Sequence, residues 1–121
     1  PQWDLRCTGK KNRYTWCAAV TKNGNDSFFN SLLRVDAKDC GAGQLLELPP
    51  GLFASEPVFV PTPGSDAEDD GVILDVIYNA NTGCSELWVM DASQIDRVIA
   101  KAFLDHHIPH QFHGCYVAGL E

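Results

Sequence analysis

Short apolar and aromatic runs alternate with turn-forming residues along the whole chain of 121 residues. β-Branched and aromatic residues favour strands, whereas clusters of Gly, Pro, Asn and Asp favour the turns between them. This pattern predicts an all-β chain of about eight strands in antiparallel meanders, at 13–20, 27–35, 44–48, 57–60, 72–78, 86–90, 97–104 and 113–117. Turns are predicted at 36–43, at 79–83 and at the Asn-Gly pair within 23–26, which suits a tight hairpin. A short helix over 95–103 is the alternative to the strand there.

The two halves of the chain resemble each other. Asp36 and Asp91 each end a strand and precede an alanine, at an offset of 55 residues. A repeat of this size is typical of propeller blades. Each half also closes on a short run that ends in an aromatic residue and a valine, 56–60 and 113–117, at an offset of 57 residues. This repeat superposes Glu56 on His113, and the two are predicted to lie at equivalent heights on neighbouring inner strands, which line the channel of a propeller. Chance similarity between two β-meanders is the alternative.

Charge and apolar content exclude several classes of protein. A net charge of −7 and a pI near 4.9 leave no basic stripe to neutralise phosphates, so nucleic acid is not an expected partner. No apolar run approaches the roughly 20 residues that span a bilayer, and no signal peptide is expected. Five cysteines without CxxC spacing favour a reducing compartment. The expected location is therefore intracellular, cytoplasmic or plastid, with secretion as the weaker alternative.

Two further stretches invite a chemical interpretation. The most acidic one, 62–71, lacks the alternating carboxylates of a calcium loop and is predicted to be a solvated loop. All four histidines fall within 106–113. Pro109 blocks the helix that would place the first three on one face, so a local zinc site is not predicted. His113 directly precedes a strand-like run and faces the predicted channel, although a purely structural histidine is the alternative.

Three motifs in one order carry a resemblance to a known family. They are Glu56-Pro57, the run Ala67-Glu68-Asp69-Asp70-Gly71, and Phe112-His113-Gly114. Together they resemble the C-terminal end of the carotenoid cleavage oxygenases, a family that includes apocarotenoid and stilbene-cleaving oxygenases and a retinoid isomerase. The resemblance covers the whole chain but only about the last quarter of a typical member. Gln111, before the Phe, departs from the family pattern.

The resemblance implies a fold. Members are seven-bladed β-propellers, so this chain would be the C-terminal portion of one, about two blades. Residues 1–55 would form a partial blade, 56–112 a full blade, and 113–121 the inner strand of the next blade. The opening Pro-Gln-Trp, without a methionine, agrees with a fragment of a longer protein.

The resemblance also implies a site and an activity. Members hold a non-haem Fe(II) with four histidines; His113 matches the last iron-binding histidine, and Glu56 matches a glutamate that hydrogen-bonds an iron ligand. The other three ligands have no counterpart here, so the fragment alone is expected to be inactive. The parent is expected to be a dioxygenase that uses O₂ to cleave a conjugated C=C bond of a small apolar substrate, a carotenoid or apocarotenoid. Alternatives are a non-catalytic β-propeller binding module or a retinoid-type isomerase, and peripheral membrane contact through missing parts of the chain stays open.

Overall fold

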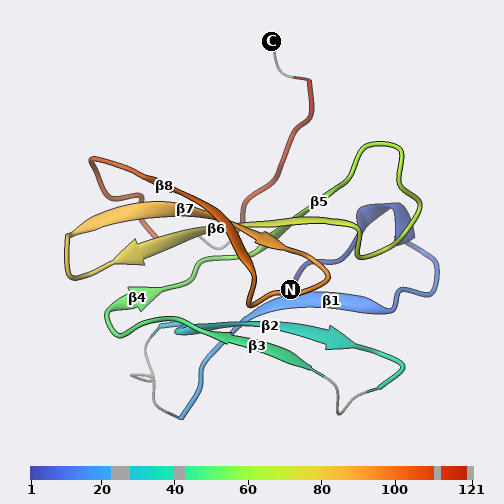
Figure 1. The fold of residues 1–121 in the computed structure, drawn as a ribbon, viewed down its shortest axis with the longest axis horizontal. Helices are drawn as coiled ribbons and strands as arrows, with labels where there is room; N and C mark the ends of the chain where they lie inside the picture. The colour runs from blue at the N-terminus through green and yellow to red at the C-terminus, as the bar shows by residue number, and fades with distance from the viewer. Residues whose placement is uncertain (23–27, 40–42, 111–112, 120–121) are drawn as a thin grey trace.

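The computed structural model describes residues 1–22, 28–39, 43–110 and 113–119. Within them the chain is nearly all β, with one turn of 3₁₀-helix at Leu5–Cys7 and no α-helix (Figure 1). The strands are β1 (Tyr14–Ala19), β2 (Ser31–Asp36), β3 (Gln44–Glu47), β4 (Leu52–Phe53), β5 (Val58–Pro61), β6 (Gly71–Asn79), β7 (Cys84–Asp91) and β8 (Val98–Phe103). The all-β prediction is confirmed. The helix alternative over 95–103 is wrong, because 98–103 form β8.

The first sheet is a three-stranded antiparallel meander, β1-β2-β3. Arg34 at its centre pairs with Trp16 on one side and with Gln44 on the other. Gln2 lies beside the outer edge of β1 and exchanges two hydrogen bonds with Trp16, of 2.7 and 2.8 Å. The start of the chain thus adds a short extended segment to this sheet. The hairpin turn predicted at 23–26 and part of the turn at 36–43 lie outside the described residues.

The second sheet is an antiparallel meander of β5, β6, β7 and β8, and β4 also pairs with β6. Phe53 of β4 lies opposite Tyr78, and Val58 of β5 lies opposite Leu74. Both short strands therefore use the same edge of β6, one after the other. Residues 54–57 cross the gap between them without a regular ladder, and this gap holds Glu56.

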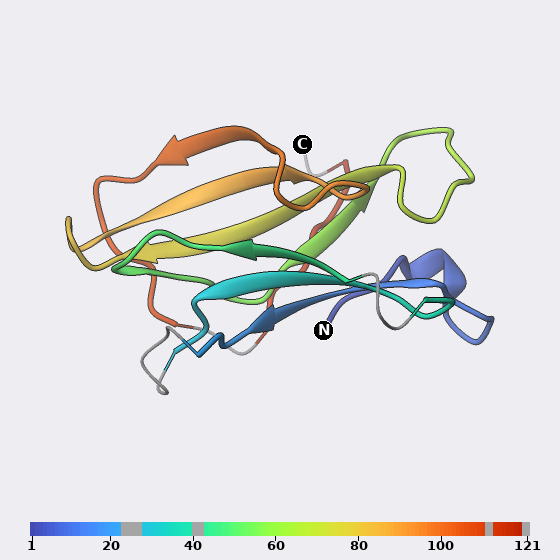
Figure 2. The same ribbon diagram turned by 60° about the horizontal axis from the view of Figure 1, so that its bottom comes forward.

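The two sheets pack face to face, as Figures 1 and 2 show in two views. Trp16 of the first sheet stacks on Phe59 of the second, with ring centroids 4.7 Å apart, and its indole Nε1 donates to the carbonyl of Ala92 at 3.1 Å. Burial of these aromatic and aliphatic side chains is the main force that joins the sheets. The core consists of Trp16, Leu32, Leu48, Leu52, Ala54, Phe59, Ile73, Ile77, Trp88, Met90, Ala92 and Ile95.

The acidic loop is largely exposed, as predicted, but two of its carboxylates, Glu68 and Asp69, also join the two sheets. Glu68 Oε1 accepts hydrogen bonds from the backbone N–H groups of Arg13 and Tyr14, at the start of β1. Asp69 forms an ion pair with Arg34, whose guanidinium is buried and lies 3.9 Å from the ring centroid of Tyr14. Backbone N–H groups near a sheet edge need acceptors. The carboxylate of Glu68 supplies such an acceptor here, whereas Asp66 and Asp70 of the same loop are exposed.

The strand predicted at 113–117 is not formed. Residues 113–119 make no ladder hydrogen bonds with the described strands, and Tyr116 and Val117 are exposed. A strand is held extended by a paired neighbour, and no described strand pairs with this run. Its assignment as the inner strand of another blade remains a prediction.

Candidate functional site

Glu56 and His113 are in direct contact. His113 Nδ1 lies 3.2 Å from each carboxylate oxygen of Glu56, and the backbone N–H of Gly114 donates to Glu56 Oε2 at 3.2 Å. The nitrogen of Pro1 lies 4.0 Å from Glu56 Oε1. The structure therefore brings together the two site residues predicted from the sequence, which are 57 positions apart.

The contact fixes the chemistry of the imidazole. A carboxylate only accepts hydrogen bonds, so the pair places the imidazole proton on Nδ1 and leaves the lone pair on Nε2. The side chain of Glu56 is 12% exposed and that of His113 is 83% exposed. Nε2 has no partner among the described residues. His113 is thus an oriented imidazole whose Nε2 lone pair is accessible, as a metal ligand requires.

Local structure explains how Glu56 is held. Ser55, Glu56 and Pro57 span the gap between β4 and β5, where no ladder hydrogen bonds constrain the backbone. Pro57 is fully buried and has a fixed φ. The N–H of Ser55 donates to Asp75 Oδ1 at 3.1 Å. Glu56 is therefore anchored on both sides while its carboxylate reaches the C-terminal segment.

The other three histidines lie outside this pair. His106 Nδ1 contacts Asp105 at 2.7 Å. The ring of His110 lies over Phe28, with centroids 4.7 Å apart, and both His107 and His110 make T-shaped contacts with the ring of Tyr78. Among the described residues no group of three or more His, Cys, Asp or Glu side chains is placed to hold a metal ion. His107 and His110 pack the loop after β8 against the end of β6.

Sequence reasoning missed Asp75. It lies in the middle of β6, opposite Trp88, and is 2% exposed. Oδ1 accepts the Ser55 hydrogen bond, whereas Oδ2 is buried and has no partner. Burial raises the pKa of Asp75 to about 8, with a smaller upward contribution from Glu56. Asp75 is therefore a neutral carboxylic acid at neutral pH. The signal in the sequence was a single Asp inside the apolar run 72–78.

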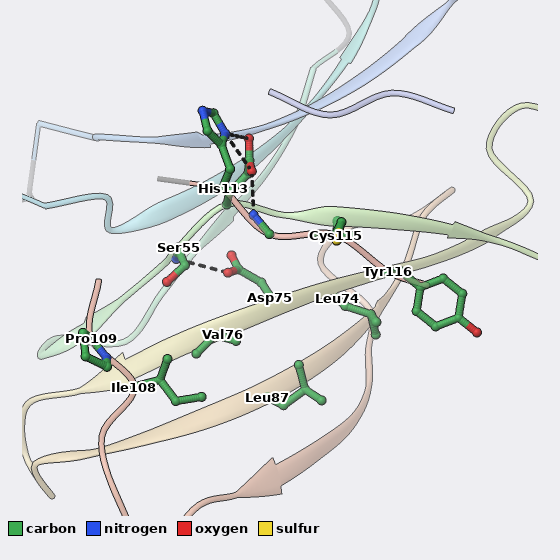
Figure 3. A pocket seen from close by; sticks show the side chains of 13 residues that line it. Ser55, Leu74, Asp75, Val76, Leu87, Ile108, Pro109, His113, Cys115 and Tyr116 are labelled. Carbon is green, nitrogen blue, oxygen red and sulfur yellow. Dashed lines mark hydrogen bonds and ion pairs between the residues drawn. The ribbon is translucent and has the colours of Figure 1, made fainter. Parts of the chain in front are cut away.

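A pocket of about 210 Å³ connects these groups. In Figure 3, Asp75 lies between His113 and the apolar side chains of Val76 and Leu87. The C-terminal segment closes one side of the pocket with Cys115 and Tyr116. The full lining is Ser55, Glu56, Val58, Leu74, Asp75, Val76, Leu87, Ile108, Pro109, His113, Gly114, Cys115 and Tyr116.

Two stacked antiparallel meanders, with a carboxylate and imidazole pair beside the start of β5, form an all-β fold with a candidate metal-ligand site. The family model described as retinal pigment epithelial membrane protein matches residues 1–118. The chain belongs to this family, that of the carotenoid cleavage oxygenases.

Curated relatives with this similarity come from distant organisms. The apocarotenoid-15,15′-oxygenase of Synechocystis is 39% identical over 109 residues, which are 89% of this chain and 22% of that protein. Carotenoid cleavage dioxygenase 8 of Arabidopsis thaliana, named as chloroplastic, is 33% identical over 90% of this chain and 18% of its own length. The mitochondrial carotenoid-cleaving dioxygenase of Macaca fascicularis is 41% identical over 91% of this chain and 19% of its own length. The chain spans about a fifth of the length of these relatives.

Solved structures agree with the fold. A cobalt-substituted Synechocystis apocarotenoid oxygenase matches with a TM-score of 0.80 and 40% identity, over 87% of this chain and 22% of that one. An ACO/RPE65 chimera matches with a TM-score of 0.82 and 36% identity, over 90% of this chain and 23% of that one. These relatives are β-propellers, so the propeller prediction is confirmed. No helix in the described residues is long and apolar enough to cross a membrane.

Proposed function

We propose that this chain is the C-terminal part of an iron-dependent dioxygenase that cleaves a conjugated C=C bond of a carotenoid or apocarotenoid with O₂. The names of the relatives support the substrate class, and the name of the cobalt-substituted relative supports a metal site. The observation that carries the proposal is the His113–Glu56 contact, with Nδ1 held and Nε2 accessible. His113 would be one iron ligand, and Glu56 would hold it.

The chemistry of this pair suits the role. An imidazole binds a metal through one nitrogen while a carboxylate on the other N–H fixes the tautomer and raises the basicity of the ligand. When bound by imidazoles with open positions, Fe(II) would supply the binding and activation of O₂. Two imidazoles in the described part of the chain contact a carboxylate, His106 and His113, and only His113 lines the pocket. The remaining ligands would therefore come from other parts of the protein. By itself this chain is therefore expected to be inactive.

The division into blades is part of the same proposal. Residues 56–112 would be a full blade, residues 1–55 most of the preceding one, and 113–121 the inner strand of the next. Leu74, Val76 and Leu87 lie on the face of the second sheet that points away from the first sheet, and they are only half-buried. This face is where the next blade would pack.

Two substitutions in the parent protein test the site. His113→Ala is expected to remove both bound iron and product formation, because an alanine offers no ligand. Glu56→Gln keeps an acceptor but loses the charge, and losses of about 10–100-fold are typical of such partners. His106→Ala is the matched control, because its ring is exposed and its hydrogen-bond partner among the described residues is Asp105. Iron content and product analysis are measured on all three.

The outcomes separate the proposed activity from its alternatives. A His113→Ala protein with full iron and turnover defeats the assignment of the ligand. A parent that binds no iron would be a non-catalytic binding module, and one that rearranges its substrate without cleaving it would be an isomerase. The cellular compartment stays a prediction, since the relatives are named as chloroplastic in some cases and mitochondrial in others.

A further inference from the structure

Asp75 is buried in apolar surroundings without a basic partner among the described residues to compensate for the loss of hydration. Its neighbours on the same face of β6 are Ile73 and Ile77, both fully buried, and Trp88 lies opposite. No basic side chain pairs with it in the described part of the chain; the arginines found in ion pairs, Arg6, Arg13, Arg34 and Arg97, contact other carboxylates. An ionised carboxylate in such a place would be strongly unfavourable. The group is therefore held as the neutral acid, with an acceptor oxygen, Oδ1, and a second oxygen, Oδ2, that can carry the proton.

The hydrogen bond that Asp75 accepts from Ser55 is placed where the backbone needs it. Ser55 directly precedes Glu56, in the stretch between β4 and β5 that lacks ladder hydrogen bonds. Pro57, on the other side of Glu56, has no N–H to offer. The contact between Ser55 N–H and Asp75 Oδ1 thus ties this stretch to the centre of β6. A shift of Ser55 would move the Glu56 carboxylate relative to His113.

We propose that Asp75 is a positioning residue, which as a neutral carboxylic acid holds Ser55 and thereby sets the Glu56 carboxylate against His113 Nδ1. It acts on the geometry of the pair, which exists without iron, and only its effect on metal binding rests on the proposed function. The position of Asp75 on the wall of the pocket that also contains Glu56 and His113 agrees with this role.

The geometry is tested first in the metal-free chain, labelled with ¹⁵N-histidine. The ring nitrogen shifts of His113 report the fraction of molecules with the proton on Nδ1. Asp75→Asn keeps a neutral group that can accept from Ser55 N–H, so this fraction is expected to stay as in the unchanged chain. Asp75→Val has a similar shape and no polar atom, and β-branched residues suit strands; here the fraction is expected to fall to the value of Glu56→Gln. Ile77→Val is the matched control, because it trims the same buried face of β6 without touching Ser55.

The parent protein supplies the second readout. Asp75→Val is expected to weaken iron binding by about 10–100-fold, no more than Glu56→Gln, because it acts through that residue. Asp75→Asn and Ile77→Val should bind iron as the unchanged protein does. If His113 proves not to bind iron, the metal readout is lost but the tautomer readout still decides the role of Asp75.

Several results would overturn the inference. An Asp75→Val chain with an unchanged Nδ1–H fraction would show that Asp75 does not position the pair. An equal fall of the Nδ1–H fraction in Asp75→Asn and Asp75→Val would show that the position requires a charged carboxylate and not a neutral acid. If the Val variant does not fold, the unchanged chain still decides: the carboxyl ¹³C shift of Asp75 must be that of a protonated acid near pH 6.5, and the Ser55 amide must exchange slowly. An ionised Asp75 or a rapidly exchanging Ser55 amide refutes the proposal.

Discussion

Replacing Asp75 by asparagine is expected to stabilise the protein, and the gain is expected to grow with pH. Burial raises the pKa of Asp75 from 3.8 to about 8 in the folded state. Between these two values the folded protein keeps a proton that the unfolded chain releases. The unfolded state then binds fewer protons, so the free energy of unfolding falls as pH rises. The protonated Asp75 carboxyl therefore contributes its full stabilisation below about pH 4. This contribution to the free energy of unfolding declines between about pH 4 and pH 8 and is constant above that.

The size of the effect follows from the same shift. One pKa unit corresponds to about 1.4 kcal/mol, which is also the slope per pH unit that one group contributes. The pKa values of Asp75 in the unfolded and folded states differ by about four units. The free energy of unfolding should therefore be lower at pH 8 than below pH 4 by on the order of 5 kcal/mol. Asparagine does not titrate, and its amide oxygen can still accept from the N–H of Ser55. The variant should therefore lose this slope and keep the hydrogen bond.

Urea unfolding of both proteins at about pH 5, 6, 7 and 8 measures the effect, because all other titrating groups cancel in the difference. The difference in free energy of unfolding should rise by about 1.4 kcal/mol per pH unit and level off above about pH 8. Asp36→Asn is the control. A hydrogen bond from Arg13 lowers the pKa of Asp36 to about 2, so Asp36 is ionised in both states across this range and its difference should be flat. A flat difference for Asp75→Asn would refute the reasoning.

Two further predictions concern the contacts between the sheets. Glu68→Gln weakens the hydrogen bonds to the backbone of Arg13 and Tyr14, so the free energy of unfolding in urea should fall by about 1–2 kcal/mol. Glu47→Gln, at an exposed position of β3, is the control and should change the free energy of unfolding little; equal effects of the two substitutions would contradict the role of Glu68 in joining the sheets. Gly71→Ala places a methyl group against the carbonyl of Val60 and within 2.8 Å of the Phe59 ring, so it should cost about 1–3 kcal/mol. Gly114→Ala meets nothing nearer than 3.9 Å and is its control; a Gly71→Ala protein as stable as this control would show that β5 and β6 pack less closely than described.

Most strands were predictable because their patterns are local. The runs that became β6 and β7 contain alternating or continuous apolar residues bounded by turn residues, and both formed within two residues of the predicted limits. The two-residue strand β4 was not predicted, because so short a segment shows no period. The run 113–117 has strand-like residues but pairs with none of the described strands. Strand formation depends on a neighbour, which propensity does not report.

For the candidate site, too, local sequence motifs identify some residues, whereas their contacts and burial depend on the fold. His113 and Glu56 were found through motifs, but their contact joins residues 57 positions apart and needs the fold. Asp75 was visible as one acid in an apolar run, yet both faces of such a run look equally apolar in the sequence. Which face is buried depends on how the first sheet packs against β6. Burial of Asp75, and with it the raised pKa, therefore appears only in three dimensions.

The residues of the acidic motif 67–71 contact the first sheet and β5 and not the candidate site. Glu68 binds the backbone at the start of β1, Asp69 pairs with the buried Arg34, and Gly71 leaves room for the carbonyl of Val60. None of the three contacts His113 in the structure. The motifs that mark the family thus combine two separate roles: residues 67–71 join the two sheets, whereas Glu56 holds His113, the candidate metal ligand. Substitutions in the first group should lower stability before they alter the tautomer of His113.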